Sequence, residues 1–172
     1  MAIQIHTERF LLRELSENDV TSRYLGWLQD DATKVFIVAA TKTNSLESLR
    51  QYIRDRFGRE DILFLGIFDK KSGLHIGNIK YEPVNGALGY AVMGILIGDP
   101  AYRSQGLGAE VLRSSARWLK SHRNIRQILL GVKDDNIAAI KSYEKVGFNV
   151  AESPYLPKAV PDQIIMTWNI PD

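Results

Sequence analysis

The run Asp99-Pro100-Ala101-Tyr102-Arg103-Ser104-Gln105-Gly106-Leu107-Gly108 decides how the rest of this chain is organised. An apolar, β-like segment, Gly94–Gly98, enters it, and an amphipathic segment, Ala109–Leu119, leaves it. A strand that turns into a helix leaves the first amide groups of that helix without intrahelical partners. Because the helix dipole favours negative charge at this end, the turn is predicted to bind an anion, above all a phosphate.

The residue types in the turn support this prediction. Gly106 and Gly108 let the backbone approach a ligand closely because they carry no Cβ atom. Arg103 adds a planar guanidinium whose donors match phosphate oxygens. The turn lacks the third glycine of the dinucleotide fingerprint and the Gly-Lys-Ser/Thr of the mononucleotide P-loop. The alternative is a helix start whose glycines only fit a tight turn.

Composition sets the class of protein. The 172 residues are 45% hydrophobic and 24% charged, which is ordinary for a globular protein, and this length predicts one domain, residues 1–172. The net charge of +2 gives no reason to expect a nucleic acid or a membrane surface as partner. The chain lacks a signal-peptide pattern and an apolar run of membrane length, so we expect a cytoplasmic protein.

Reactive and metal-binding side chains are few. The chain has no cysteine, which excludes disulfides, thiolate metal sites and a cysteine nucleophile. His6, His75 and His122 are scattered without the spacing of metal ligands. We therefore expect no metal site.

Hydrophobic spacing predicts the other elements. The predicted strands are Arg9–Leu15, Ile62–Phe68, His75–Val84, Leu88–Gly98, Gln127–Val132, Phe148–Ala151 and Gln163–Ile170. The predicted helices are Val20–Leu28 after a cap at Ser16–Asp19 and ending at Asp30-Asp31, Leu46–Phe57 after a capping box of Asn44 and Glu47, Ala109–Leu119, and Asn136–Val146. Asn85-Gly86 predicts the turn of a β-hairpin.

The order of these elements is β-αα-βββ-α-β-α-ββ. It predicts an α/β fold with a single mixed, mostly antiparallel sheet and helices on both faces. A helix separates Gln127–Val132 from Gly94–Gly98, so these two segments are predicted to be parallel neighbours.

A second pattern lies further along the chain, Asn136-Ile137-Ala138-Ala139-Ile140-Lys141-Ser142-Tyr143-Glu144-Lys145-Val146-Gly147-Phe148. By itself it predicts a helix with Asn136 as N-cap and Gly147 as C-terminal stop. It follows the Arg-x-x-Gly-x-Gly turn by about thirty residues, as a strand and a helix require. Together the two patterns, and the element order over essentially the whole chain, resemble the GNAT superfamily of acetyl-CoA-dependent N-acetyltransferases.

The resemblance implies acetyl-CoA as co-substrate. The pantetheine arm would pair with backbone at the end of the segment Gly94–Gly98, and the diphosphate would sit on the amides of the glycine turn. The cofactor-binding residues that it implies are Leu96, Ile97, Gly98, Arg103, Ser104, Gln105, Gly106, Leu107, Gly108, Asn136 and Tyr143.

The same resemblance implies direct attack of an amine on the thioester in a ternary complex. Tyr143 matches the position whose hydroxyl protonates the leaving thiolate, and a tyrosine that only packs is the alternative. Tyr90–Gly98 lacks the carboxylate often found on this strand in the superfamily. Glu82 is the nearest acidic candidate for a base, and it shares a strand face with Asn78 and Lys80. That polar face lines the acceptor pocket or faces water, and a water relay can replace the base.

Short cues to the acceptor disagree. Thr7–Arg13 followed by Asp19 resembles ribosomal-protein N-terminal acetyltransferases, whereas Tyr24–Leu28 and His75–Ile79 resemble bacterial acetyltransferases of amino sugars. The leading hypothesis is acetyl transfer to the primary amine of a small acceptor such as an amino sugar. The alternatives are a protein N-terminus as acceptor, or a non-catalytic acyl-CoA sensor. A homodimer is among the expectations for such a fold.

Overall fold

The computed structural model describes residues 2–30 and 44–172. Its elements follow the predicted order, with one additional strand at the N-terminus. In chain order they are β1 (Gln4–His6), β2 (Phe10–Glu14), the 3-10 helix η1 (Glu17–Asp19), α1 (Ser22–Gln29), α3 (Leu46–Arg54), β3 (Leu63–Asp69), β4 (His75–Asn85), β5 (Tyr90–Ile97), the 3-10 helix η3 (Pro100–Tyr102), α4 (Leu107–Arg123), β6 (Gln127–Lys133), α5 (Ile137–Val146), β7 (Asn149–Val150) and β8 (Gln163–Asn169).

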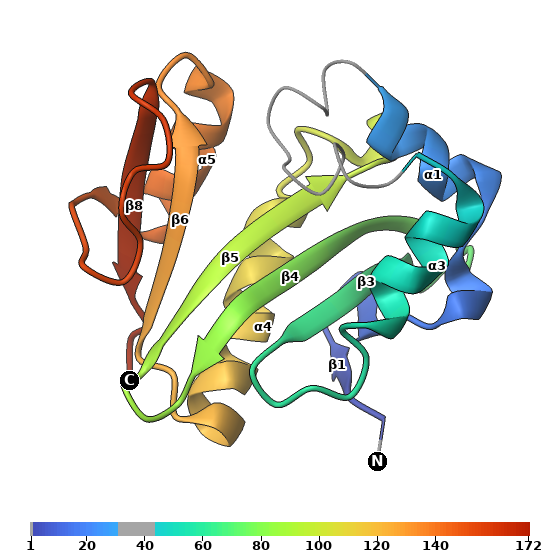
Figure 1. Ribbon diagram of the computed structural model, residues 1–172, viewed down its shortest axis with the longest axis horizontal. Coiled ribbons are helices and arrows are strands. Elements are labelled where there is room, and N and C mark those ends of the chain that lie inside the picture. Colours follow the sequence, from blue (N-terminus) through green and yellow to red (C-terminus); the bar gives the residue numbers. More distant parts are fainter. Residues whose placement is uncertain (1, 31–43) are drawn as a thin grey trace.

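The strands of the described residues form a single sheet of eight in the order β1-β2-β3-β4-β5-β6-β8-β7 (Figure 1). Neighbouring strands are antiparallel, except that β5 and β6 run parallel. The mixed, mostly antiparallel sheet predicted from the sequence is therefore confirmed, including its parallel pair.

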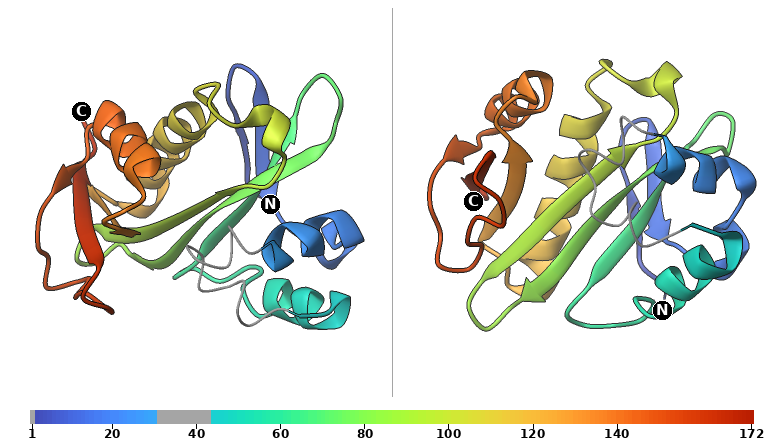
Figure 2. Two further views of the ribbon diagram at one scale, coloured as in Figure 1. Left: turned by 90° about the horizontal axis from the view of Figure 1, so that it is seen from above. Right: turned by 45° about the horizontal axis from the view of Figure 1, so that its top comes forward.

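Helices cover both faces of the sheet (Figure 2). On one face, α4 and α5 enclose the larger apolar core, in which Val111 of α4 packs with Ile79 and Tyr81 of β4. On the other face, α1 and α3 enclose a smaller core around Leu49 and Ile53. In the described part of the chain, none of the helices has both the length and the apolar character needed to cross a membrane.

The parallel pair of β5 and β6 is short. Tyr90, Ala91 and Val92 pair with residues of β6, and the register ends there. β5 continues beside β4 as far as Ile97, and Figure 1 shows β5 and β6 diverging beyond their paired ends. Residues 93–97 thus form an edge of β5, called here the free edge, that no described strand covers.

The hairpin turn between β4 and β5 is wider than the predicted Asn85-Gly86 turn. The Gly89 amide donates to the Asn85 carbonyl oxygen over 2.8 Å, and Gly89 adopts a left-handed φ of 77°. Gly86 has a different role, because a Cβ atom there would lie 2.6 Å from the carbonyl oxygen of Arg123 at the end of α4. A close approach of backbone to backbone therefore accounts for the glycine of this pair.

Two predicted helix starts are wrong by two residues each: α1 begins later than predicted, and α4 begins at Leu107 instead of Ala109. The helix predicted from Val20 begins at Ser22, because the Thr21 side chain accepts the Tyr24 amide over 3.1 Å. The predicted cap at Ser16–Asp19 instead begins η1, with Ser16 as its N-cap.

The capping box predicted for α3 is displaced as well. It uses Ser45 and Ser48, whose hydroxyl groups each accept the other residue's amide over 3.0 Å, instead of Asn44 and Glu47. A serine hydroxyl oxygen can accept a backbone amide, so serine can serve either position of the box. Asp31, predicted to end the first helix, lies outside the described residues, whereas Asp30 is its C-cap.

Helix α1 packs tightly against the end of β5. The Trp27 indole is 9% exposed and covers Gly98, where a Cβ atom would lie 2.0 Å from Cδ2 of the ring. Arg23 of α1 forms an ion pair of 2.7 Å with Asp99, the next residue. Because the indole is rigid and surrounded, the space above Gly98 admits only hydrogen.

We predict that Gly98→Ala is strongly destabilising, whereas Gly94→Ala on the same strand is not. The methyl group at Gly98 overlaps Trp27, and overpacking of this kind costs about 2 kcal/mol or more. A Cβ atom at Gly94 meets nothing within 4 Å. Thermal unfolding should show a Tm lower by at least about 4 °C for the first variant. Equal Tm values for the two variants would contradict the packing described here.

Candidate functional site

The turn between β5 and α4 is anchored to the sheet. Asp99 caps η3 by accepting the Ala101 amide over 2.9 Å. The Tyr102 hydroxyl donates to Asp69 over 2.9 Å, and the Tyr102 ring meets Phe10 edge-on with 6.2 Å between centroids. These contacts fix the backbone before it enters the glycine segment.

The glycine segment presents a series of unused amides. Ser104 and Gly106 adopt left-handed φ values of 60° and 74°. Within residues 2–30 and 44–172, the amides of residues 104–109 have no acceptor, and the first one that does is that of Glu110, which donates to Gly106. Consecutive amides at a helix N-terminus attract anions, because the partial positive charges add to the helix dipole. The arrangement fits a diphosphate.

Arg103 lies across the end of β5. Its Nε donates to the Ile97 carbonyl oxygen over 3.1 Å, and its Nη2 to that of Gly98 over 3.5 Å. The guanidinium is therefore next to the turn, as the sequence suggested, and is engaged by backbone of the strand.

The peptide groups of the free edge can be assigned from the pairing of β5 with β4. Gly98 donates its amide to Ile76 of β4. In an antiparallel pair, alternate residues point toward the partner, so the peptide groups of Leu96 also face β4. Those of Ile95 and Ile97 face away from β4, in agreement with the bond from Arg103 to the Ile97 carbonyl. Ile95 thus offers an unpaired amide and carbonyl, and Ile97 an unpaired amide, to which an extended ligand can add as a strand, whereas the Ile97 carbonyl already accepts from Arg103.

Helix α5, which follows β6, carries Asn136 and Tyr143. Asn136 is the N-cap, and its side chain accepts the Ala139 amide over 3.4 Å. The half-buried Tyr143 ring packs on Phe148 with 5.7 Å between centroids. Burial raises the pKa of Tyr143 to about 12, so the phenol keeps its proton at neutral pH. In the described part of the chain none of the buried polar side-chain atoms lacks a partner, and the Tyr143 hydroxyl makes no hydrogen bond there, so this hydroxyl is open to solvent and available to a ligand.

The polar row of β4, Asn78, Lys80 and Glu82, is only partly open to water. It contacts the two helices of the smaller core through hydrogen bonds between Asn78 and Tyr24, between Lys80 and Tyr52, and between Glu82 and Arg56. Asn78 is 5% exposed. The row therefore belongs to the interface between the sheet and helices α1 and α3.

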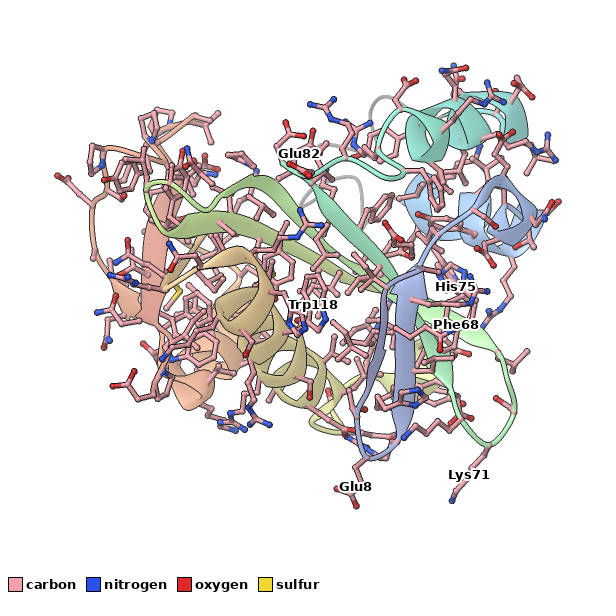
Figure 3. The ribbon with its side chains drawn as sticks, turned by 90° about the horizontal axis from the view of Figure 1, so that it is seen from below. Glu8, Phe68, Lys71, His75, Glu82 and Trp118 are labelled. Atoms are coloured by element: carbon pink, nitrogen blue, oxygen red, sulfur yellow. The ribbon has the colours of Figure 1, made fainter. Side chains whose placement is uncertain are left out.

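Glu82 lies at a bulge in the pairing of β4 with β5. The register shifts between Tyr81 and Val84, so Glu82 stands opposite Val92, where β5 and β6 begin to part. Figure 3 shows Glu82 on the α3 side of the sheet and Trp118 on the opposite, α4 side. Glu82 is thus level with the start of the free edge but on the face away from α4 and α5.

Two cations hold the Glu82 carboxylate. Lys80 Nζ and Arg56 Nε each lie 3.0 Å from its Oε2. Burial alone raises the pKa of Glu82, but hydrogen bonds and charge from Lys80, and then from Arg56, lower it overall. The carboxylate is therefore ionised at neutral pH.

The structure thus brings the predicted residues into two groups. The turn, Arg103 and the end of the free edge lie together, and Tyr143 lies on α5 on the same face of the sheet as α4 (Figure 2). Glu82 lies on the opposite face with the polar row. Within the described ranges, no three side chains of His, Cys, Asp or Glu gather in a way that could hold a metal ion.

Sequence patterns missed a contact that secures α4. Glu110, in the first turn of α4, binds Thr7 and Arg9 in the loop between β1 and β2. The partners are 101 residues apart in the case of Arg9, so no local spacing could have revealed the contact.

Comparison with known proteins gives a local sequence match and full-length structural matches. Over 53 residues the chain is 43% identical to the mycothiol acetyltransferase of Corynebacterium glutamicum (strain R), a match that covers 31% of this chain and 18% of that protein. The chain thus spans less than a fifth of the length of this relative.

The solved structures that share the fold over nearly their whole length include two named acetyltransferases. RimL, a ribosomal L7/L12 alpha-N-protein acetyltransferase in complex with coenzyme A, superposes with a TM-score of 0.83 at 15% identity, covering 98% of both chains. A chimera of the spermidine N-acetyltransferase SpeG from Vibrio cholerae and hSSAT has a TM-score of 0.77 at 16% identity, covering 94% of this chain and 96% of the other.

The model of the acetyltransferase (GNAT) domain family matches residues 9–149, and this range holds both patterns that carried the resemblance, the glycine turn and the segment from Asn136 to Phe148. The chain belongs to the GNAT acetyltransferase family.

Proposed function

We propose that this protein is an acetyl-CoA-dependent N-acetyltransferase that acts on the primary amine of a small acceptor. The observation that carries the proposal is the run of unused amides at residues 104–109 beside the free edge of β5. The first feature suits a diphosphate, and the second suits an extended arm with peptide-like groups, which is the chemistry of coenzyme A. The coenzyme A complex of the RimL structure supports the same assignment by analogy of fold.

In this proposal the turn and the free edge divide the binding between them. The amides of residues 104–109 bind the diphosphate, with Arg103 beside them. Peptide groups of Ile95 and Ile97 pair with the pantetheine arm. An amide of this edge also stabilises the negative charge that develops on the carbonyl oxygen during attack. Acetyl-CoA supplies the thioester that the amine attacks.

No covalent acyl-enzyme is needed. The chain has no cysteine, so acetyl-CoA and the amine react directly in a ternary complex. Holding two reactants in the correct orientation can lower the barrier by roughly 7–11 kcal/mol. Tyr143 then needs only to protonate the departing thiolate, and a base needs only to remove a proton from the amine.

The acceptor is proposed from the local sequence match. The name of the relative that is 43% identical over 53 residues, mycothiol acetyltransferase, favours a small-molecule acceptor. The fold does not discriminate, because the two structural neighbours are named for a ribosomal protein and for spermidine. The partly exposed end of the polar row, Lys80 and Glu82, lies on the face from which we expect the acceptor to enter.

The activity is tested by release of free thiol from acetyl-CoA. We expect turnover with a small primary amine, with glucosamine exceeding spermidine and a peptide with a free N-terminus in kcat/KM. If only the peptide is acetylated, the acceptor is a protein N-terminus and not a small molecule. Stabilisation by coenzyme A without turnover of any amine would instead support the acyl-CoA sensor.

We predict that Tyr143→Phe lowers kcat by about a hundredfold or more, since general acid catalysis contributes on this scale. The folded protein should be unaffected, because the ring still packs on Phe148. In the wild type, the pKa near 12 predicts that kcat does not fall on the alkaline side until well above pH 10. The control is Tyr155→Phe, at a tyrosine that is 41% exposed. If the two variants have equal kcat values, Tyr143 does not act as the acid and serves only to pack against Phe148.

We further propose Glu82 as the group that takes the proton from the amine. Glu82→Gln should then lower kcat at least about tenfold at neutral pH and move the rising limb of kcat/KM to higher pH. The exposed Glu8→Gln is the matched control, and Figure 3 shows Glu8 directed into solvent.

The ion pairs of Glu82 give a separate effect on stability. A carboxyl whose pKa is lowered by folding stabilises the folded state at neutral pH, and this contribution disappears as the pH falls through the lowered value. Glu82→Gln should therefore unfold at a lower Tm than wild type at pH 7 and at the same Tm in strong acid. A lower Tm at pH 7 with an unchanged pH–rate profile would assign the carboxylate to the ion pairs alone.

A further inference from the structure

The loop between β1 and β2 is attached to the first turn of α4 by one carboxylate. Glu110 Oε1 accepts hydrogen bonds from the Thr7 hydroxyl over 2.6 Å and from the Arg9 amide over 2.8 Å. Glu110 Oε2 accepts from Arg9 Nε over 2.7 Å. Burial alone raises the pKa of Glu110, but these bonds from Thr7 and Arg9 lower it overall, so the carboxylate is ionised and fully engaged.

This attachment sets the direction of the Arg9 side chain. A Cβ atom built on Gly106 would lie 4.0 Å from Arg9 Nη2, so the end of the guanidinium is beside the N-cap of α4. Only Nε is used by Glu110, and within residues 2–30 and 44–172 neither Nη group has an acceptor. The side chain is 40% exposed. Arg9 thus presents its two outer nitrogens to solvent at the run of unused amides.

Arg103 differs from Arg9 in this respect. Its Nε and Nη2 already donate to carbonyl groups at the end of β5. Of the two guanidinium groups at the turn, Arg9 is the one that is held in place by a carboxylate while its fork of Nη donors is unoccupied. That fork matches two oxygens of a phosphate.

We propose that Arg9, oriented by Glu110, binds the diphosphate of coenzyme A together with the amides of residues 104–109. The inference rests on the proposed function, since it adds a residue to the same binding site. Arg9 contacts the ligand directly, and Glu110 is a positioning residue that aligns the guanidinium. The charge of Glu110 does not repel the ligand, because both of its oxygens are engaged and Arg9 neutralises it.

The test measures binding of three ligands by calorimetry: coenzyme A, 3′-dephospho-coenzyme A, and pantetheine, which lacks all phosphates. Arg9→Gln should weaken binding of the first two by about tenfold or more and leave pantetheine unchanged. The loss should shrink as salt is raised, because screening weakens the contribution of an exposed charge in the wild type. Arg117→Gln, on the exposed side of α4, is the matched control and should bind all three ligands as the wild type does.

Two more variants separate binding from folding. Arg9→Lys keeps the charge without the fork and should recover only part of the affinity. Glu110→Gln should raise the KM for acetyl-CoA without changing kcat, because it disturbs the alignment of Arg9 and not the reacting atoms. If Arg9→Gln weakens the binding of coenzyme A and of pantetheine equally, Arg9 has a structural role and the inference is overturned.

The inference and the proposed function fail in different ways. If the wild type binds coenzyme A and Arg9→Gln binds it equally well, the role of Arg9 is refuted and the proposed function is not. If the wild type does not bind coenzyme A at millimolar concentration, both the proposed function and the role of Arg9 are refuted.

Discussion

Backbone hydrogen bonding governs the arrangement of this molecule. Peptide groups must find partners, and those of a strand normally find them on both sides. Here β5 is paired with β4 along its length but with β6 only through Val92. In the described part of the chain the peptide groups of residues 93–97 on that side have no strand partner, and the Ile97 carbonyl accepts only from Arg103. The amides of residues 104–109 that follow have no acceptor there. Both sets lie along one path, which suits a long ligand with a charged end.

Contacts between distant segments hold this path in place. Trp27 of α1 covers Gly98, and Arg23 of the same helix pairs with Asp99, so the end of β5 is fixed from one face. Glu110 of α4 binds Thr7 and Arg9, which lie in the loop between β1 and β2. The turn therefore stands between two rigid supports. These contacts keep the unpaired polar groups in a defined geometry, so that they do not rearrange to bond with one another.

The two faces of the sheet differ in chemistry. The face toward α4 and α5 is apolar apart from a few hydroxyl groups, such as those of Tyr81 and Ser115, which lie 2.7 Å apart. The face toward α1 and α3 carries the polar row of Asn78, Lys80 and Glu82. In the proposed reaction the acid, Tyr143, and the proton acceptor, Glu82, belong to opposite faces. An amine that enters from the polar face would attack across the free edge, and the thiolate would leave toward α5.

The sequence by itself determined the order of elements, the mixed sheet with its parallel pair and the family, because these follow from hydrophobic period, turn residues and two local motifs. It also located the glycine turn, whose amides are adjacent in the chain. Helix caps were displaced by one or two residues, since neighbouring hydroxyl groups compete for the same amides. The roles of Tyr143 and Glu82 stay predictions.

Only the tertiary structure decided what surrounds these elements. It placed the polar row against α1 and α3, engaged Glu82 with Arg56 and Lys80, and brought Arg9 to the N-terminus of α4. The reason is physical: a local pattern reports hydrogen bonds between near neighbours, whereas a contact such as that of Arg9 with Glu110 spans 101 residues and exists only once strand order and register are fixed.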